Sequence, residues 1–317
     1  MNCLLLLASL IGWSPAVGRA TPLEYCDPDE LDSPGPSGIP VLMYHHVSDP
    51  VNGYYGVSTH RFRTDLAQLD RAGFCLIGPD DIGNGLMTVP PDRRPVMLTF
   101  DDGWQDNFSF TRLPDGSWGT DPSCALAILE EYCEDNPDFG HGAVFFISWD
   151  KVPFGQEEFV AEKMNLLLDM GYTVGNHTFR HASFMRLPAA KWEEAVVRAL
   201  QRFRSNLGIR TWTVDTLAYP GGMLPRGCDA EEILAEMQFD GRNAVTMGFL
   251  ANGSVSSMAS LLSSENGWFR LGRLDMSQYS VAELLRWSNL MQPEIREDLH
   301  DPLSRRILRL SSPSLRT

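Results

Sequence analysis

The nine residues VMLTFDDGW, at positions 96–104, join a short apolar run to two adjacent carboxylates. The run Val96–Phe100 predicts a strand, and its unbroken apolar character is typical of a strand covered on both faces of a parallel sheet. Asp101 and Asp102 stand where that strand ends. Asp-Asp-Gly is also a common loop sequence, so the pair alone is a weak indication of function.

Short apolar runs alternate with helical patterns along most of the chain. Strands are expected at 39–44, 75–77, 96–100, 143–147, 172–174, 216–219, 244–247 and 269–274, and helices at 62–72, 124–132, 159–170, 192–207, 231–237 and 281–291. Roughly seven such alternations over about 250 residues favour an α/β fold with a single distorted, TIM-like (β/α) barrel of about seven or eight strands. Cys124 and Cys133 lie on one expected helix, too far apart for a disulfide.

The composition excludes several classes of protein. The chain has 317 residues, with 26 Lys and Arg against 41 Asp and Glu, and a formal net charge of −15. Its hydrophobic content of 43% is that of a folded globular protein and not of a disordered one. Without a basic block, binding to nucleic acid or to anionic membranes is disfavoured. No protein partner can be inferred.

Residues 1–20, MNCLLLLASLIGWSPAVGRA, predict a cleaved signal peptide. The apolar stretch Cys3–Trp13 is too short to span a bilayer comfortably, and small residues at Gly18 and Ala20 suit a cleavage region. An uncleaved anchor or a buried first helix is the alternative. We therefore expect a secreted or periplasmic protein without stable membrane insertion.

The rest of the chain divides by composition. Residues 21–38 predict an acidic linker rich in Pro and Gly, residues 39–291 the folded domain, and residues 292–317 a weakly structured tail. Within the domain, residues 109–122 are expected to form an irregular insertion after a strand end. One barrel therefore accounts for the folded part of the chain.

Four polar segments stand at the ends of expected strands. They are YHH at 44–46, TFDDGW at 99–104, GNHTFRH at 175–181 and AYPGG at 218–222. In a barrel these ends share one face, where such folds assemble active sites.

Histidines are concentrated in these segments, which hold His45, His46, His177 and His181 of the 7 in the chain. His177 and His181 are four residues apart, which would place both rings on one side of a helical turn and permit shared metal ligation. Each segment alone is a weak indication of a metal site, whereas the four together are a strong one.

The segments resemble the metal-dependent polysaccharide deacetylases, the carbohydrate esterases that share the NodB homology domain. TFDDG, HTFRH and YPGG carry the resemblance. VLMYHHVSD and residues 57–77 are similar to the Tyr-His branch, which contains the biofilm poly-N-acetylglucosamine deacetylases. The resemblance extends from about residue 39 to about residue 291 and implies a NodB-type barrel.

The resemblance implies that Asp102, His177 and His181 bind a divalent metal, with zinc preferred and cobalt, nickel or iron(II) as alternatives. It implies that Asp101 is the general base for a metal-bound water, the nucleophile. General chemistry agrees, because three protein ligands leave a position open for water and a divalent ion lowers the pKa of that water. The backbone N–H of Gly221, after Pro220, is the implied oxyanion donor.

Two departures from the family pattern affect the proton donor. Ala218 stands where many members have Arg. The histidine that usually acts as general acid, near the final strand, is absent, and Arg273 and Leu274 lie there instead. The Tyr-His branch implies the amino-proximal histidine instead, so we interpret His45 as the general acid, with His46 as the alternative. Arg273 is expected to orient Asp101, with an ordinary surface arginine as the alternative.

Aromatic side chains near the strand ends are candidates for sugar binding. We expect Tyr54, Tyr55 and Trp104 to stack against sugar rings, with ordinary packing as the alternative. The insertion between Asp106 and Ser123 and the segment at 153–156 depart from the shortest biofilm-type pattern. These departures leave the glycan open among poly-N-acetylglucosamine, chitin oligomers, peptidoglycan and other N-acyl sugars.

The sequence thus predicts a secreted, metal-dependent hydrolase that removes N-acetyl groups from an N-acetylglucosamine-type polysaccharide. The alternatives are a non-catalytic glycan-binding protein of the same fold and a metal-dependent hydrolase of non-sugar amides. Non-haem iron oxygenases also use two histidines and a carboxylate, but their double-stranded β architecture does not fit the β/α alternation.

Overall fold

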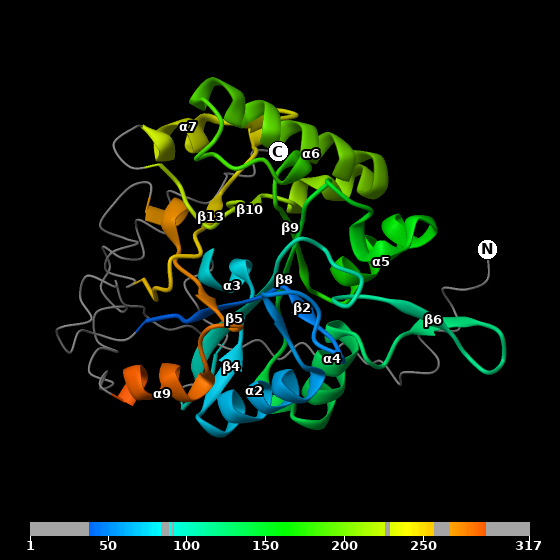
Figure 1. Ribbon diagram of the computed structural model, residues 1–317. Helices are drawn as coiled ribbons and strands as arrows, with labels where there is room; N and C mark the ends of the chain where they lie inside the picture. Colours follow the sequence, from blue (N-terminus) through cyan, green and yellow to red (C-terminus); the bar gives the residue numbers. More distant parts are fainter. Residues whose placement is uncertain (1–37, 84–88, 91, 226–228, 257–266, 290–317) are drawn as a thin grey trace.

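The computed structural model describes residues 38–83, 89–90, 92–225, 229–256 and 267–289 (Figure 1). The expected signal peptide, all of the expected linker but residue 38, and the expected tail lie outside these residues. No helix in the described ranges is long and apolar enough to cross a membrane.

A curled parallel sheet forms the centre of the molecule (Figure 1). Its strands follow the order β13 (Met247–Phe249), β10 (Thr216–Ala218), β9 (Thr173–Asn176), β8 (Val144–Ile147), β5 (Arg94–Phe100), β1 (Val41–Tyr44) and β14 (Leu274–Asp275). A further strand, β4 (Phe74–Leu76), pairs with the first half of β5. The expected α/β class is confirmed.

The two ends of this order meet through hydrogen bonds of the backbone. Leu250 donates to the carbonyl of Leu271, and Leu271 donates to that of Gly248, so β13 lies beside the residues that lead into β14. The sheet is therefore closed by a short irregular segment, and the distorted (β/α) barrel is confirmed.

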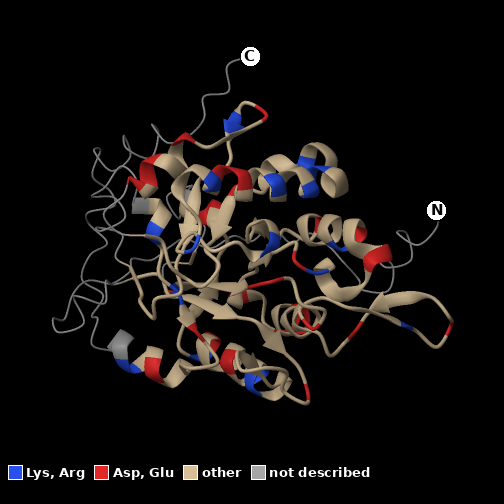
Figure 2. Cartoon of the chain, turned by 45° about the horizontal axis from the view of Figure 1, so that its top comes forward, with Lys and Arg blue, Asp and Glu red and all other residues tan. Residues whose placement is uncertain are grey.

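Helices flank the sheet on its outer side (Figure 1). They are α2 (Thr59–Arg71), α3 (Pro79–Gly83), α4 (Ala125–Asp135), α5 (Val160–Asp169), α6 (Trp192–Leu207), α7 (Ala230–Glu236) and α9 (Val281–Asn289). Helix α2 begins where the Ser58 hydroxyl accepts from the Arg61 amide at 3.0 Å, a standard N-cap. Charged residues lie mostly on helices and loops, and the strands are largely uncharged (Figure 2).

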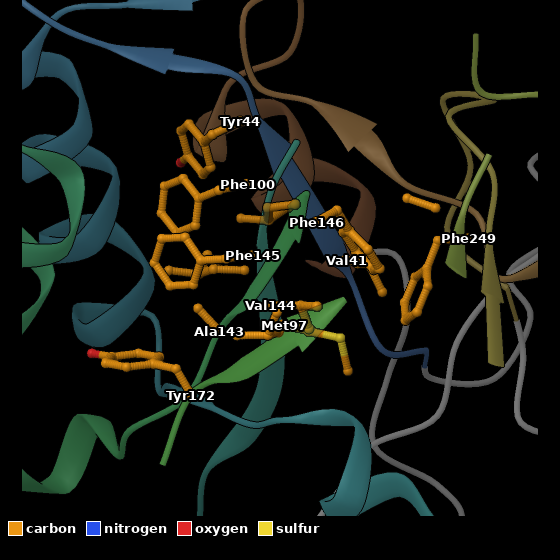
Figure 3. Close-up of a cluster of buried hydrophobic side chains, with 14 of the residues drawn as sticks. Val41, Tyr44, Met97, Phe100, Ala143, Val144, Phe145, Phe146, Tyr172 and Phe249 are labelled. Atoms are coloured by element: carbon orange, nitrogen blue, oxygen red, sulfur yellow. The ribbon is translucent and has the colours of Figure 1, made fainter. Parts of the chain in front are cut away.

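The core lies on both faces of the sheet (Figure 3). Phe145 stacks on Phe100 with ring centroids 4.8 Å apart, whereas Phe146, the next residue, packs against Phe249 at 5.3 Å. Successive strand residues point to opposite faces, so the unbroken apolar runs reflect burial on both. Gly175 is required beside this layer, because a Cβ there would lie 2.4 Å from the Phe146 ring.

Three expectations about local structure are corrected. The strand expected at 244–247 begins only at Met247. In the strand expected at 269–274, residues Gly267–Arg270 form a 3₁₀ turn and only Leu274 belongs to β14. These segments make the irregular closure of the barrel, where apolar content does not require regular pairing.

The third correction concerns the insertion at 109–122, which is a hairpin of β6 (Phe110–Arg112) and β7 (Trp118–Thr120). Gly116, at φ 83°, lies in the turn between the strands, and the Arg112 guanidinium stacks over the Trp118 ring at 4.3 Å. The hairpin projects from the body of the molecule (Figure 1).

The remaining short strands are β2 (His46–Val47), β3 (Gly56–Val57), β11 (Gln238–Phe239) and β12 (Arg242–Asn243). Cys124 and Cys133 are buried and form no disulfide within the described part of the chain, and their spacing predicted that they would not pair with each other.

Candidate active site

A carboxylate and two imidazoles meet at the carboxyl ends of β5 and β9. The Asp102 Oδ1 atom lies 3.5 Å from Nε2 of His177 and 3.5 Å from Nε2 of His181. One donor atom from each residue lies within 4.8 Å of the other two. Oδ1 is buried and receives no hydrogen bond from any described residue. Because a buried carboxylate oxygen requires a partner, this arrangement fits a divalent metal with nitrogen and oxygen ligands.

His177 is oriented by the neighbouring strand. Its Nδ1 lies 2.8 Å from the carbonyl of Ala218, the last residue of β10. With Nδ1–H donating there, the Nε2 lone pair faces Asp102, which is the usual arrangement for a metal-ligating histidine. Burial lowers the pKa of His177, which favours the neutral ring that ligates metal.

The turn after β9 differs from the helical turn that the spacing predicted. Thr178, Arg180 and His181 all have positive φ, of 62°, 60° and 52°. Such conformations cost about 1–3 kcal/mol each and concentrate at functional sites. The Asn176 side chain supports the turn, since its Oδ1 accepts from the Thr178 amide at 2.8 Å and its Nδ2 donates to the Val196 carbonyl of α6 at 3.2 Å.

This strained turn brings the two imidazoles together without a helix, with ring centroids 4.9 Å apart. The His181 side chain is 42% exposed and that of His177 is 2% exposed. The three-residue group is therefore open to solvent on one side.

Asp101 is buried and paired with Arg273. The two guanidinium NH atoms donate to Oδ1 at 2.6 Å and to Oδ2 at 2.8 Å. Arg273 is itself held by the Leu250 carbonyl and the Thr99 hydroxyl. Burial alone would raise the pKa of Asp101, but the charges of Arg273 and His177 outweigh it and hold the pKa well below its usual range. The carboxylate is therefore anionic and fixed.

The two adjacent histidines after β1 lie in different surroundings. His45 stacks on Tyr55 at 5.1 Å, and its buried Nδ1 has no hydrogen-bond partner in the described part of the chain. Burial lowers its pKa, against the opposing charges of Asp101 and Asp102. His46, in contrast, contacts the Asp106 carboxylate through Nδ1 at 2.7 Å. Of the two Nδ1 atoms, that of His46 is engaged by a carboxylate, whereas that of His45 is buried without a partner among the described residues.

Sequence reasoning missed Asp275, which ends β14. It is paired in register with Met43 of β1 and is buried, and its charge raises the pKa of His45. Its Oδ1 accepts from the backbone amide and the hydroxyl of Ser277, and its Oδ2 accepts from the side-chain Nε2 of Gln278. The signal that could have identified it is an acidic residue at the end of the last strand, by analogy with Asp101.

The remaining predicted residues lie around this group. Pro220 is buried and Gly221 is exposed, with a φ of 78°. The Gly221 amide has no acceptor among the described residues, whereas the Gly222 amide donates to the Tyr219 carbonyl.

The predicted aromatic residues differ in exposure. Tyr54 is 81% exposed and packs edge-on against Tyr55, which is 47% exposed. Trp104 is only partly exposed, and its indole N–H donates to Asp102 Oδ2 at 3.1 Å. Tyr54 and Tyr55 therefore present open ring surface near His45, and Trp104 is committed to the carboxylate.

Residues 88–240 match the family model for polysaccharide deacetylase. The chain carries a polysaccharide deacetylase domain. The matched residues include the two carboxylates, His177, His181 and Gly221, and exclude His45 and Arg273. The expected family is confirmed, and its membership supports a hydrolytic deacetylase.

Solved structures extend the likeness of the deacetylase domain over most of the chain. The deacetylase PplD of Streptococcus pyogenes, in complex with acetate, is 20% identical with a TM-score of 0.58, covering 82% of this chain and 100% of its own. IcaB of Ammonifex degensii is 18% identical with a TM-score of 0.53, covering 79% of this chain and 97% of its own. At these identities the likeness establishes the fold. No curated protein matches the sequence.

Proposed function

We propose that the protein is a secreted, metal-dependent hydrolase that removes N-acetyl groups from an N-acetylglucosamine-type polysaccharide. One observation carries the proposal. Oδ1 of Asp102 lies 3.5 Å from each of two imidazole nitrogens without a hydrogen bond from the described part of the chain, and the adjacent residue is a second carboxylate that Arg273 holds anionic. The first group suits a metal ion, and the second suits a base.

Asp102, His177 and His181 would hold the metal, and zinc suits this donor set. When bound, a divalent ion polarises the acyl oxygen and lowers the pKa of water. The open side of the group, marked by the exposed His181 ring, leaves room for water and substrate.

Asp101 is assigned the role of general base. It takes a proton from the water that attacks the acetamide carbonyl, while Arg273 fixes both carboxylate oxygens. The free N–H of Gly221 is assigned to the oxyanion, because preorganised donors stabilise charge that develops in the transition state.

His45 is assigned the role of general acid. When the C–N bond of the acetamide breaks, the leaving nitrogen needs a proton, and the products are acetate and a free amine. The nearby carboxylates, Asp275 among them, favour the protonated form of His45 against the effect of burial. His46 suits this role less well, because its Nδ1 is engaged by Asp106.

The substrate assignment draws on two exposed aromatic rings, Tyr55, which stacks on His45, and Tyr54, which packs against Tyr55. Aromatic faces suit the apolar faces of sugar rings. A small non-sugar amide would make no use of these rings, and a non-catalytic glycan-binding protein would make no use of a fixed buried base.

The test is acetate release by the zinc-loaded protein from poly-N-acetylglucosamine, chitin oligomers and peptidoglycan, with simple acetanilides as the non-sugar arm. We expect release from at least one glycan and little from acetanilides. Release from acetanilides alone would favour the amide hydrolase. Binding to a glycan without release from any substrate would favour the non-catalytic protein. Turnover without oxygen excludes an oxygenase.

A further inference from the structure

The Trp104 indole contacts Asp102, one of the three proposed metal ligands. Its Nε1–H donates to Asp102 Oδ2 at 3.1 Å, while Oδ1 faces the two Nε2 atoms and receives no hydrogen bond within the described ranges. We propose that Trp104 is a positioning residue that reserves Oδ1 of Asp102 for the metal and so sets the metal affinity of the site. This inference rests on the metal site of the proposed function.

The indole ring is held from several directions. The His46 ring lies at 4.2 Å between centroids, and Lys151 Nζ lies 4.1 Å from the indole centroid. The Trp104 backbone amide donates to Asn107 Oδ1 at 3.0 Å. The His46 ring and the Lys151 ammonium thus both pack against the indole, which leaves less of its surface for the sugar stacking expected from the sequence.

The groups that hold the indole are themselves anchored. His46 Nδ1 contacts Asp106 at 2.7 Å, and Lys151 Nζ contacts Asp150 Oδ1 at 3.1 Å. Asn107 Nδ2 donates to the His45 carbonyl at 2.6 Å. The loops after β1, β5 and β8 thus converge on one indole.

This arrangement has a chemical consequence for the carboxylate. An indole N–H is a donor only, so the oxygen that it engages carries less negative charge for a metal. Without that donor, the Asp102 carboxylate is free to rotate, and Oδ1 is no longer held towards the two imidazole nitrogens. Loss of a group that orients a ligand typically weakens metal binding about 10–100-fold.

The test compares Trp104→Phe with Trp212→Phe, the same change at a partly exposed tryptophan that belongs to the turn at Gly208–Thr213, away from the site. Zinc affinity is measured by competition with a chelator, and Co²⁺ absorption spectra report the coordination geometry. We expect Trp104→Phe to bind zinc about 10–100-fold more weakly with altered Co²⁺ bands, and Trp212→Phe to match the unmodified protein. Unchanged affinity and an unchanged spectrum in Trp104→Phe would overturn the inference.

A second measurement uses only the unmodified protein and so does not depend on whether Trp104→Phe folds. In unmodified protein labelled with ¹⁵N at the tryptophan indoles, zinc should shift the Trp104 N–H resonance, because the metal draws charge from Asp102, and leave that of Trp212 in place. A Trp104 resonance that stays fixed while zinc binds would overturn the inference. Its failure is separable from that of the proposed function, which is judged by acetate release from the unmodified protein.

Discussion

Replacing Arg273 by Met should destabilise the protein strongly at neutral pH. Arg273 is 1% exposed and Asp101 2%, and the guanidinium donates to both carboxylate oxygens. Removing one partner from a buried ion pair leaves an unpaired buried charge and costs about 3–5 kcal/mol. That is a large share of the roughly 5–15 kcal/mol that stabilises a domain.

The loss should depend on pH in a defined direction. In the unmodified protein the pKa of Asp101 lies below its usual range, because Arg273 and His177 outweigh burial. The stability that this carboxylate contributes is complete above its unfolded pKa, about 4, and is lost as the pH falls through the lower folded pKa. Without Arg273, burial raises the pKa, so the variant recovers stability as Asp101 binds a proton on acidification. The deficit should therefore be smaller at pH 5 than at pH 7.

Urea unfolding followed by tryptophan fluorescence, in chelator, measures both effects. Arg63→Met is the matched control, because its pair with Glu131 is about half exposed and such pairs contribute little. The double variant Asp101→Asn/Arg273→Met should be more stable at pH 7 than Arg273→Met alone. A deficit below about 1 kcal/mol, the range of an exposed pair, or a deficit equal at pH 5 and pH 7, would refute the reasoning.

Three further outcomes are expected. In the unmodified protein, kcat/KM should fall as the pH rises through the pKa of His45, which burial lowers. This fall should disappear in His45→Gln, and an unchanged pH profile would remove His45 from the acid role. Lys163, whose buried ammonium donates to the Phe108 and Phe154 carbonyls, has its pKa lowered by burial to about 8. The stability of the unmodified protein relative to Lys163→Met should therefore rise between pH 8 and pH 10, by on the order of 2 kcal/mol; a constant difference by urea unfolding would contradict this. Tyr54→Ala should raise KM for glycan oligomers severalfold with little change in kcat, whereas Ile209→Ser, at a 64% exposed position on the turn at Gly208–Thr213, should change neither.

The sequence predicted the barrel because its strands are unbroken apolar runs separated by helical patterns. Helix α6 begins and ends where the periodicity placed it, at Trp192–Leu207. The last part of the barrel could not be predicted in this way. There Leu271 joins β13 through isolated hydrogen bonds, and apolar content does not distinguish such a segment from a strand.

Residue types at strand ends indicated the carboxylates and histidines of the site, and the family resemblance implied which of them are ligands, but neither predicted their geometry. A spacing of four suggests a helical turn, whereas Thr178, Arg180 and His181 adopt positive φ values, which are uncommon for residues other than Gly. The Asn176 contact with α6 helps to hold that turn, and it depends on the folded barrel.

Long-range contacts were the least accessible to sequence reasoning. The contact of Arg273 with Asp101 joins residues 172 positions apart, and only the family resemblance suggested it. The Trp104 contact with Asp102 spans only two residues, yet the sequence offered sugar stacking and ordinary packing as the roles of this side chain and did not suggest the contact. Residue type alone does not separate a ring that binds substrate from one that orients a ligand.

The most direct test compares the zinc-loaded unmodified protein with Asp101→Asn in acetate release from N-acetylglucosamine polymers. The zinc content and the circular dichroism of both proteins are measured on the same samples. We predict that the unmodified protein releases acetate and exposes one amine per acetate, and that Asp101→Asn retains zinc and fold but is about 10²–10⁴-fold slower. Release at an undiminished rate by Asp101→Asn, or no release by the zinc-loaded unmodified protein, would contradict the account.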